Sequence, residues 1–366
     1  MADEQEPTVD LEDIGPSDTT KPFDPALIRI EHRVMSVDQL VRRLAQNEID
    51  LLPDFQRAGG LWKPREKSRL IESLMIRIPI PAFYMDASDE SRWVVVDGLQ
   101  RLTVLNEYIV EKSWGLEDLE FQPYGGKKFD DLPRGMQRRI EEAQVTVYLI
   151  QPGTPPEVKY NIFKRINTGG LPLSPQEIRH ALNQGQSTEL LKKLAETESF
   201  IKATDNGLRN QRMQDRECVL RFLSFLITPY REYKTQDLDG FLNRQMAVIN
   251  RMSPIEVKRL EGSFHRAMSM AVAIFGNDAF RKRYSRQAPR KPINKALFET
   301  WSVNLARLGP DEALRLEERR DALIDGFIAL MHQWDFDRAV TQGTGDVAKL
   351  HLRFSGIEQL IQKVVA

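Results

Sequence analysis

The stretch Arg92-Trp-Val-Val-Val-Asp-Gly-Leu-Gln-Arg-Leu-Thr-Val-Leu105 decides how the first half of the chain folds. Its apolar run, Trp93–Val96, is rich in β-branched residues and predicts a buried strand. The apolar residues that follow recur at spacings of three and four, which predicts a helix. Four residues therefore lie where the strand gives way to the helix: Asp97, Gly98, Gln100 and Arg101.

This junction has two interpretations. Backbone N–H groups at the start of a helix attract anions, and an arginine there offers a fork that matches phosphate oxygens. Glycine lets a ligand approach the backbone closely. The structural alternative is an ordinary strand–turn–helix junction, in which Asp97 caps the helix.

Two further stretches flank the junction. Leu52-Pro-Asp-Phe-Gln-Arg57 lies upstream, and Tyr160-Asn-Ile-Phe-Lys-Arg-Ile-Asn-Thr-Gly-Gly170 lies downstream. Together the three stretches resemble the ParB/sulfiredoxin-like family that forms the N-terminal domain of GmrSD-type, modification-dependent restriction enzymes. That family shows Pro-x-x-Gln-Arg, Asp-Gly-Gln-Gln-Arg and Arg-Ile-Asn-Thr-Gly segments in this order. Here Leu99 replaces the first Gln of the central motif, so any role of that side chain is lost or moved.

The resemblance favours a nucleotide site over a surface salt bridge at these positions. Asp97 is expected to hold Mg²⁺, Gln100 to orient a water, and Arg101 to stabilise charge on a transferring phosphoryl group. A nucleoside triphosphate and Mg²⁺ are thus the expected cofactors. Seven residues are assigned to nucleotide or phosphate binding: Gln56, Arg57, Gly98, Lys164, Arg165, Asn167 and Thr168. The sequence has no Gly-x-x-x-x-Gly-Lys-Ser/Thr loop, which excludes standard P-loop chemistry.

The downstream stretch also has a structural interpretation. Cations in the last turn of a helix suit its dipole, and Asn or Gly commonly ends a helix. This accounts for Lys164, Arg165 and Gly169 but does not require Asn167 and Thr168. A helix cap and a loop that faces nucleotide or DNA remain equally open.

Charge is unevenly distributed along the chain. Of its 52 bases and 53 acids, one base and eight acids lie in residues 1–25, which leaves 51 bases and 45 acids in the rest. Residues 1–25 are also proline-punctuated and are expected to be a disordered acidic tail. The mildly basic remainder permits a polyanionic partner. The single Cys218 predicts a buried thiol in a cytoplasmic protein with no disulfide.

The order of patterns predicts an α+β protein with two domains. Residues 26–150 mix strand and helix patterns and are expected to form a small ParB/sulfiredoxin-like lobe, whereas residues 151–366 are expected to form a larger all-helical domain. Capping-box signatures start helices at Ser36 and Ser174. Helices of the second domain are expected at 188–196, 215–228, 237–250, 255–275, 292–307, 312–334 and 346–364.

Residues 281–295 contain seven bases and no acid. Such a cluster is costly unless it meets solvent or an anion, and a phosphate backbone is its usual partner. A solvated loop between helices is the alternative. The residues assigned to DNA contact are Arg281, Lys282, Arg283, Arg286, Arg290 and Lys291.

These observations favour a nucleotide-binding module, with possible nucleoside triphosphatase activity, of a restriction or anti-phage system that acts on DNA or is regulated by it. A partner nuclease or other defence protein is expected, because the C-terminal half shows no His-centred nuclease motif. The alternatives are a non-catalytic ParB-like DNA-binding protein and a protein-interaction module with a vestigial site. No apolar run approaches the ~20 residues of a membrane helix, so no membrane partner is expected.

Overall fold

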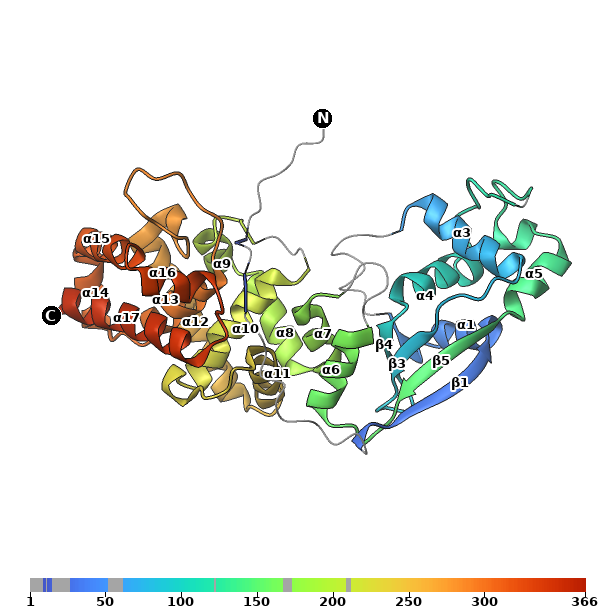
Figure 1. Cartoon of the computed structure of the whole chain (residues 1–366), viewed down its shortest axis with the longest axis horizontal. Helices are drawn as coiled ribbons and strands as arrows, with labels where there is room; N and C mark the ends of the chain where they lie inside the picture. The colour runs from blue at the N-terminus through green and yellow to red at the C-terminus, as the bar shows by residue number, and fades with distance from the viewer. Residues whose placement is uncertain are drawn as a thin grey trace. The chain divides into compact units, whose positions relative to one another are not determined.

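The computed structural model describes residues 9–10, 12–14, 27–51, 62–121, 123–166, 173–208 and 212–366. The chain forms two compact units, Phe23–Leu182 and Asn183–Ala366, and the second unit also includes Met1–Pro22. We call them the sheet unit and the helical unit (Figure 1). The sheet unit continues past the boundary that we expected at residue 151.

The sheet unit is built on a mixed five-stranded sheet in the order β1-β5-β3-β4-β2. The pairs β1–β5 and β3–β4 are antiparallel, whereas β3–β5 and β2–β4 are parallel. The strands are β1 (Ile30–Ser36), β2 (Ile49–Asp50), β3 (Phe83–Asp86), β4 (Trp93–Asp97) and β5 (Gln144–Ile150). The strand expected at Trp93–Val96 is therefore confirmed as β4, and the α+β class is confirmed by this sheet and the helices around it.

Local sequence signals explain where the first helices begin. Ser36 caps α1 and forms a reciprocal capping box with Gln39, and Pro64 occupies the first turn of α3. The helices of the sheet unit are α1 (Val37–Ala45), α3 (Pro64–Met75), α4 (Leu99–Leu105), α5 (Arg134–Glu141), α6 (Pro156–Ile166) and α7 (Pro175–Leu182). A π-helical turn, Asn106–Val110, extends α4.

One face of the sheet carries the core of this unit. Alternate side chains of a strand point to opposite faces, and Phe83, Met85 and Val95 pack with apolar residues of α1, α3, α4 and α5. Asp86 points the other way and forms an ion pair of 2.9 Å with Lys159 of α6. Helix α6 therefore lies against the opposite face at the Asp86 end of β3.

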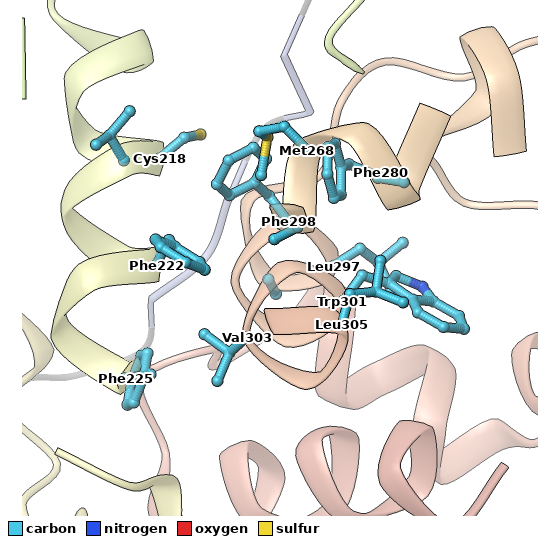
Figure 2. Packing of buried hydrophobic residues seen from close by; sticks show 14 of the residues in the cluster. Cys218, Phe222, Phe225, Met268, Phe280, Leu297, Phe298, Trp301, Val303 and Leu305 are labelled. Atoms are coloured by element: carbon cyan, nitrogen blue, oxygen red, sulfur yellow. The ribbon is translucent and has the colours of Figure 1, made fainter. Parts of the chain in front are cut away.

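The helical unit has its own core. Figure 2 shows Cys218, Phe222 and Phe225 of α10 facing Phe298 and neighbouring residues of α13. The thiol of Cys218 is fully buried, as expected, and burial raises its pKa. The helices are α8 (Gln186–Ala195), α9 (Glu198–Ala203), α10 (Gln214–Ile227), α11 (Leu238–Ile249), α12 (Pro254–Phe275), α13 (Lys295–Ala306), α14 (Pro310–Glu318), α15 (Arg320–Met331), α16 (Trp334–Thr341) and α17 (Val347–Val365).

The helical character expected for residues 151–366 is confirmed, with two differences in detail. The expected helix 312–334 is divided into α14 and α15 at Arg319, and the short helices α9 and α16 were not expected. In the part of the chain that the structure describes, no helix combines the length and apolarity needed to cross a lipid bilayer.

Candidate functional site

The junction between β4 and α4 depends on Gly98. Its φ of 99° lies in the left-handed region, and a Cβ at this position would come within 2.5 Å of Cδ1 of Phe83. Gly98 is itself the N-cap of α4, which has no side-chain cap. The structural alternative, in which Asp97 caps this helix, is therefore excluded, because the left-handed turn places Gly98 at that position.

Arg101 points inward instead of toward solvent. Its side chain is only 10% exposed and its guanidinium donates to Asp97 at 2.8 Å, to the carbonyl of Ala82 at 3.2 Å and to the carbonyl of Pro81. The same group lies 4.7 Å from the ring centroid of Phe83. Arg101 thus ties the end of β4 to the start of β3, and this geometry suits a residue that positions Asp97 rather than one that contacts a phosphate.

Burial governs the electrostatics of the Asp97–Arg101 pair. Desolvation raises the pKa of the Asp97 carboxyl, and the charge of Arg101 and the N–H of Gly98 oppose that rise. Desolvation also lowers the pKa of Arg101, against the charge of Asp97. Asp97 therefore has a greater affinity for protons than an exposed aspartate, which is a useful property for a group that accepts a proton or binds a cation.

The other expected site residues are placed less completely. The side-chain oxygen of Gln100 accepts a hydrogen bond of 3.4 Å from the backbone N–H of Trp62. Lys164 and Arg165 are exposed in the last turn of α6, where cations suit the helix dipole. Four expected residues lie outside the described part of the chain: Gln56, Arg57, Asn167 and Thr168. The structure thus brings together Asp97, Gly98, Gln100 and Arg101 at one turn.

A row of aromatic side chains was missed by the sequence analysis. His32, Tyr148, Tyr84 and Asp97 are direct partners on successive strands β1, β5, β3 and β4. Tyr84 and Tyr148 stack with ring centroids 4.9 Å apart and planes at 18°, and His32 lies 5.3 Å from Tyr148. We call His32, Tyr148 and Tyr84 the aromatic row.

The aromatic row lies on the face of the sheet opposite the core. Tyr84 alternates with the buried Phe83 and Met85, and Tyr148 alternates with Val147 and Leu149. Both tyrosines are half-buried and His32 is exposed. The alternation of apolar and polar residues in these strands was the signal that could have revealed the row. Its pairing across the sheet could not be read from sequence, because register depends on which strands become neighbours.

The basic residues of 281–291 are mostly neutralised by acids from distant parts of the chain. Arg281 is buried and donates to the carbonyls of Thr204, Asn277 and Lys291, so its expected role as an exposed DNA contact is wrong. The remaining ion pairs are Lys282–Asp10, Arg283–Asp278, Arg286–Asp321, Arg286–Asp325 and Arg290–Asp205. Arg286, Arg290 and Lys291 are the exposed members of the stretch.

No group of three or more histidine, cysteine or carboxylate side chains suited to a metal ion occurs among the described residues. Asp97 is the carboxylate that the described part of the strand–turn–helix junction contributes. Mg²⁺ commonly binds through one or two carboxylates and completes its shell with waters and substrate phosphates. The site therefore fits a Mg²⁺ ion that arrives with a nucleotide better than a resident ion.

The fold and the site define an α+β domain with a strand–turn–helix motif beside a sheet face that carries aromatic side chains. In sequence, residues 38–184 match the family model of the N-terminal domain of the GmrSD restriction endonuclease. The match covers 147 of the 366 residues, so the likeness to this family is established for that part of the chain. No curated protein matches the chain. The matched residues nearly coincide with the sheet unit and include the Asp97-Gly98-Leu99-Gln100-Arg101 turn.

Proposed function

We propose that the sheet unit binds a nucleoside triphosphate with Mg²⁺, and that the chain is a nucleotide-dependent module of a restriction-type, anti-phage system that acts on DNA. The observation that supports nucleotide binding most directly is the placement of two stacked tyrosines, Tyr84 and Tyr148, beside the Asp97–Arg101 pair. Aromatic faces stack on nucleobases of any sequence. The family match supports the restriction context.

Each residue has a distinct role in this proposal. Asp97 holds the Mg²⁺ ion that accompanies the phosphates, and Arg101 fixes the carboxylate through their 2.8 Å ion pair. Gly98 forms the left-handed turn, in which Phe83 leaves no room for a side chain, and Gln100 orients the attacking water. Further phosphate contacts are assigned to Gln56, Arg57, Lys164, Arg165, Asn167 and Thr168.

Nucleotide hydrolysis is the reaction that this set of groups suits. Water attacks the γ-phosphorus while the bond to the leaving diphosphate oxygen breaks, and the enzyme mainly positions the groups and stabilises charge. The helical unit then contacts DNA or a partner nuclease, which supplies the DNA cleavage.

Titration calorimetry of the full chain with Mg²⁺ and each common nucleoside triphosphate tests the binding step. We expect Tyr84→Ala and Tyr148→Ala to raise Kd by roughly tenfold, because stacking on an aromatic side chain contributes about 1–3 kcal/mol per base. Phe121→Ala is the matched control, since Phe121 is 65% exposed in the same unit but outside the aromatic row. Wild type that binds no nucleotide, or tyrosine variants that bind as wild type does, would refute this part of the proposal.

One observation favours a second candidate function. The guanidinium of Arg101 is engaged by Asp97 and two carbonyls, which leaves it poorly placed for transition-state chemistry. A non-catalytic, ParB-like DNA-binding protein or an interaction module with a vestigial site requires no such chemistry. DNA binding by a wild-type chain that neither binds nucleotide nor releases phosphate would favour the ParB-like function.

A further inference from the structure

The extreme N-terminal part of the chain lies on the helical unit. Asp10 N–H donates to the carbonyl of Ile293 at 2.8 Å, and the N–H groups of Thr344 and Gly345 donate to the carbonyls of Asp13 and Ile14 at 2.9 and 3.1 Å. Parallel bridges join Val9 to Ile293 and Asp13 to Gln342. We call residues 9–14, of which 9–10 and 12–14 are described, the N-terminal segment. It binds as an extended peptide does, through its backbone.

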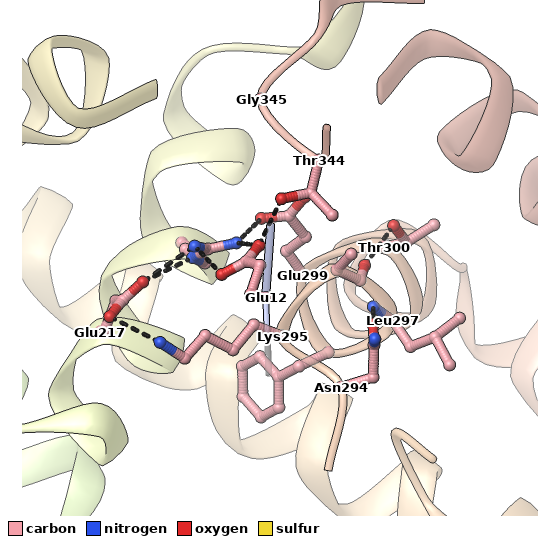
Figure 3. Close-up of polar contacts among 12 residues, drawn as sticks. Glu12, Glu217, Asn294, Lys295, Leu297, Glu299, Thr300, Thr344 and Gly345 are labelled. Carbon is pink, nitrogen blue, oxygen red and sulfur yellow. Dashed lines mark hydrogen bonds and ion pairs between the residues drawn. The ribbon is translucent and has the colours of Figure 1, made fainter. Parts of the chain in front are cut away.

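The acidic side chains of the segment meet cations. Glu12 accepts two hydrogen bonds from Arg221, at 2.7 and 2.6 Å, and one from the hydroxyl of Thr344 at 2.5 Å. Asp10 pairs with Lys282 at 2.5 Å and accepts from the amide of Asn294 at 3.1 Å. Figure 3 shows Glu12 together with Thr344, Glu217, Glu299 and Lys295. The negative charges of the segment are therefore complementary to the positive charges of the surface that it contacts.

Glu12 completes a buried charge network. Arg221, Arg353 and Glu299 have fully buried side chains, and Lys295 pairs with Glu217 at 2.9 Å. Three cations, Arg221, Arg353 and Lys295, meet two carboxylates of the helical unit, Glu217 and Glu299, and the Glu12 carboxylate makes the set neutral. Without Glu12 the network carries one excess positive charge. The site therefore favours another anionic group in the place of the Glu12 carboxylate.

The segment is connected to the helical unit as a terminal peptide. The whole sheet unit, Phe23–Leu182, separates it in sequence from the helices that it contacts. Its docking is thus an intramolecular binding event, and its effective concentration depends on the linker that follows it. Arg221 keeps Glu217 and Glu299 as partners, at 2.8 and 3.4 Å, when the segment leaves. The empty site therefore remains partly satisfied.

We propose that this surface of the helical unit is a binding site for an extended acidic peptide, and that its occupant is the N-terminal segment of the same chain, bound reversibly. The fully buried Arg221 and the hydroxyl of Thr344 select the carboxylate at position 12, and the carbonyl of Ile293 and the N–H groups of Thr344 and Gly345 align the backbone. An acidic segment of a partner protein with the same spacing of carboxylates competes for the site. Binding of an acidic partner would thus release the N-terminal segment from the helical unit.

The test uses a chain that folds before it is cut. A protease recognition sequence is inserted between residues 17 and 18, and after cleavage the released N-terminal peptide is removed by gel filtration. A fluorescent peptide of residues 1–16 is then titrated and its anisotropy is measured. We expect saturable binding to the cleaved protein, weak binding to the uncut protein, and at least tenfold weaker binding of the Glu12→Gln peptide. Glu4→Gln is the matched control, because it removes the same charge outside the described contacts.

Three results would overturn the proposal. Equal weakening by Glu12→Gln and Glu4→Gln would reduce the interaction to general charge attraction. An N-terminal fragment that never leaves the cleaved protein, without exchange for labelled peptide, would make the segment an integral part of the core. An uncut chain that forms dimers by exchanging the segment would replace the proposed occupant with a second copy. Loss of nucleotide binding has no bearing on any of these readouts.

Discussion

At the scale of single residues, Arg101 stabilises the start of the candidate site. Its guanidinium donates to Asp97 and to the carbonyls of Pro81 and Ala82 in a largely buried position. We expect Arg101→Ala to lower the free energy of unfolding of the sheet unit by about 3 kcal/mol, because it leaves a buried charge and two carbonyls without their donor. Urea denaturation followed by circular dichroism measures the loss.

Arg101→Lys is the matched control for this prediction. Lysine keeps the charge but cannot reach three acceptors in the geometry of a guanidinium, so its loss should be intermediate. A loss below about 1 kcal/mol for Arg101→Ala would indicate that water replaces the arginine. Any fall in nucleotide turnover in Arg101→Ala has to be compared with its stability, since the residue positions other groups.

Asp97 gives the sheet unit a pH dependence of known sign. Burial raises the pKa of its carboxyl above the usual value, so the folded state binds the proton more tightly than the unfolded state. This contribution to stability is fully present below the unfolded pKa of about 4 and is lost as the pH rises through the folded pKa. We expect Asp97→Asn, which does not titrate, to gain stability relative to wild type as the pH rises from about 4 toward neutrality.

Urea denaturation at several pH values measures this difference. Asp118→Asn is the control, because Asp118 is an exposed carboxylate of the same unit, with a side chain that is 64% exposed. A difference between wild type and Asp97→Asn that stays constant with pH would contradict the prediction.

At the scale of elements, short-range signals were sufficient to predict most of the fold. Ser36 and Ser174 form capping boxes with residues three positions away, and the run Trp93–Val96 became β4, because these features depend on neighbouring residues. The inward orientation of the Arg101 side chain was not predictable, because the carbonyls that accept its hydrogen bonds belong to Pro81 and Ala82, just before β3. The aromatic row was not predictable either, because its residues come from three strands that are distant in sequence.

The basic stretch 281–291 shows the same limit. Its acids come from positions far away in sequence, such as Asp205 and Asp321, so a stretch that contains bases alone is largely neutral in the folded protein. The ion pair between Asp10 and Lys282 was likewise not predicted from the sequence, because an acidic N-terminal stretch with several prolines has the composition of a disordered tail. Long-range pairing of charges is therefore what sequence patterns alone did not show.

Two arginines of this stretch provide a paired prediction. Burial lowers the pKa of Arg281 to about 10, and its guanidinium holds three carbonyls, whereas Arg286 is exposed. We expect Arg281→Ala to destabilise the helical unit by about 2–3 kcal/mol and Arg286→Ala, which removes the same charge, by less than about 1 kcal/mol. Thermal melting measures both. Equal losses would mean that burial of the guanidinium is unimportant.

At the scale of the whole molecule, DNA has to compete with internal carboxylates. The exposed side chains Arg286 and Arg290 already pair with Asp321, Asp325 and Asp205. If Arg286, Arg290 and Lys291 contact phosphates, their joint replacement by alanine should lower the slope of log K against log salt by roughly one unit per lost contact. Filter binding or anisotropy at several salt concentrations measures the slope.

Lys63→Ala is a control for this DNA prediction, because Lys63 is an exposed base of the other unit. An unchanged slope in the triple variant would assign these residues to internal ion pairs alone. DNA contact by the protein would then have to be sought on the sheet unit.

The two units have separate cores, so they need not unfold together. A ligand stabilises only the unit that binds it, by about 2.7 kcal/mol when its concentration is one hundred times Kd. For a unit of this size that corresponds to a rise of roughly 5–10 °C in Tm. We therefore expect Mg²⁺ and the preferred nucleoside triphosphate to raise one of two calorimetric transitions, that of the sheet unit.

Core variants assign the transitions. Leu74→Ala removes a buried side chain of α3 and Phe222→Ala one of α10, and each should lower the transition of its own unit by creating a cavity. With its roughly tenfold higher Kd, Tyr84→Ala should reduce the nucleotide-induced shift by about half while leaving the helical unit's transition in place. A nucleotide-induced shift confined to the transition that Phe222→Ala lowers would show that the nucleotide binds the helical unit. That result would refute the roles proposed for Asp97 and the aromatic row.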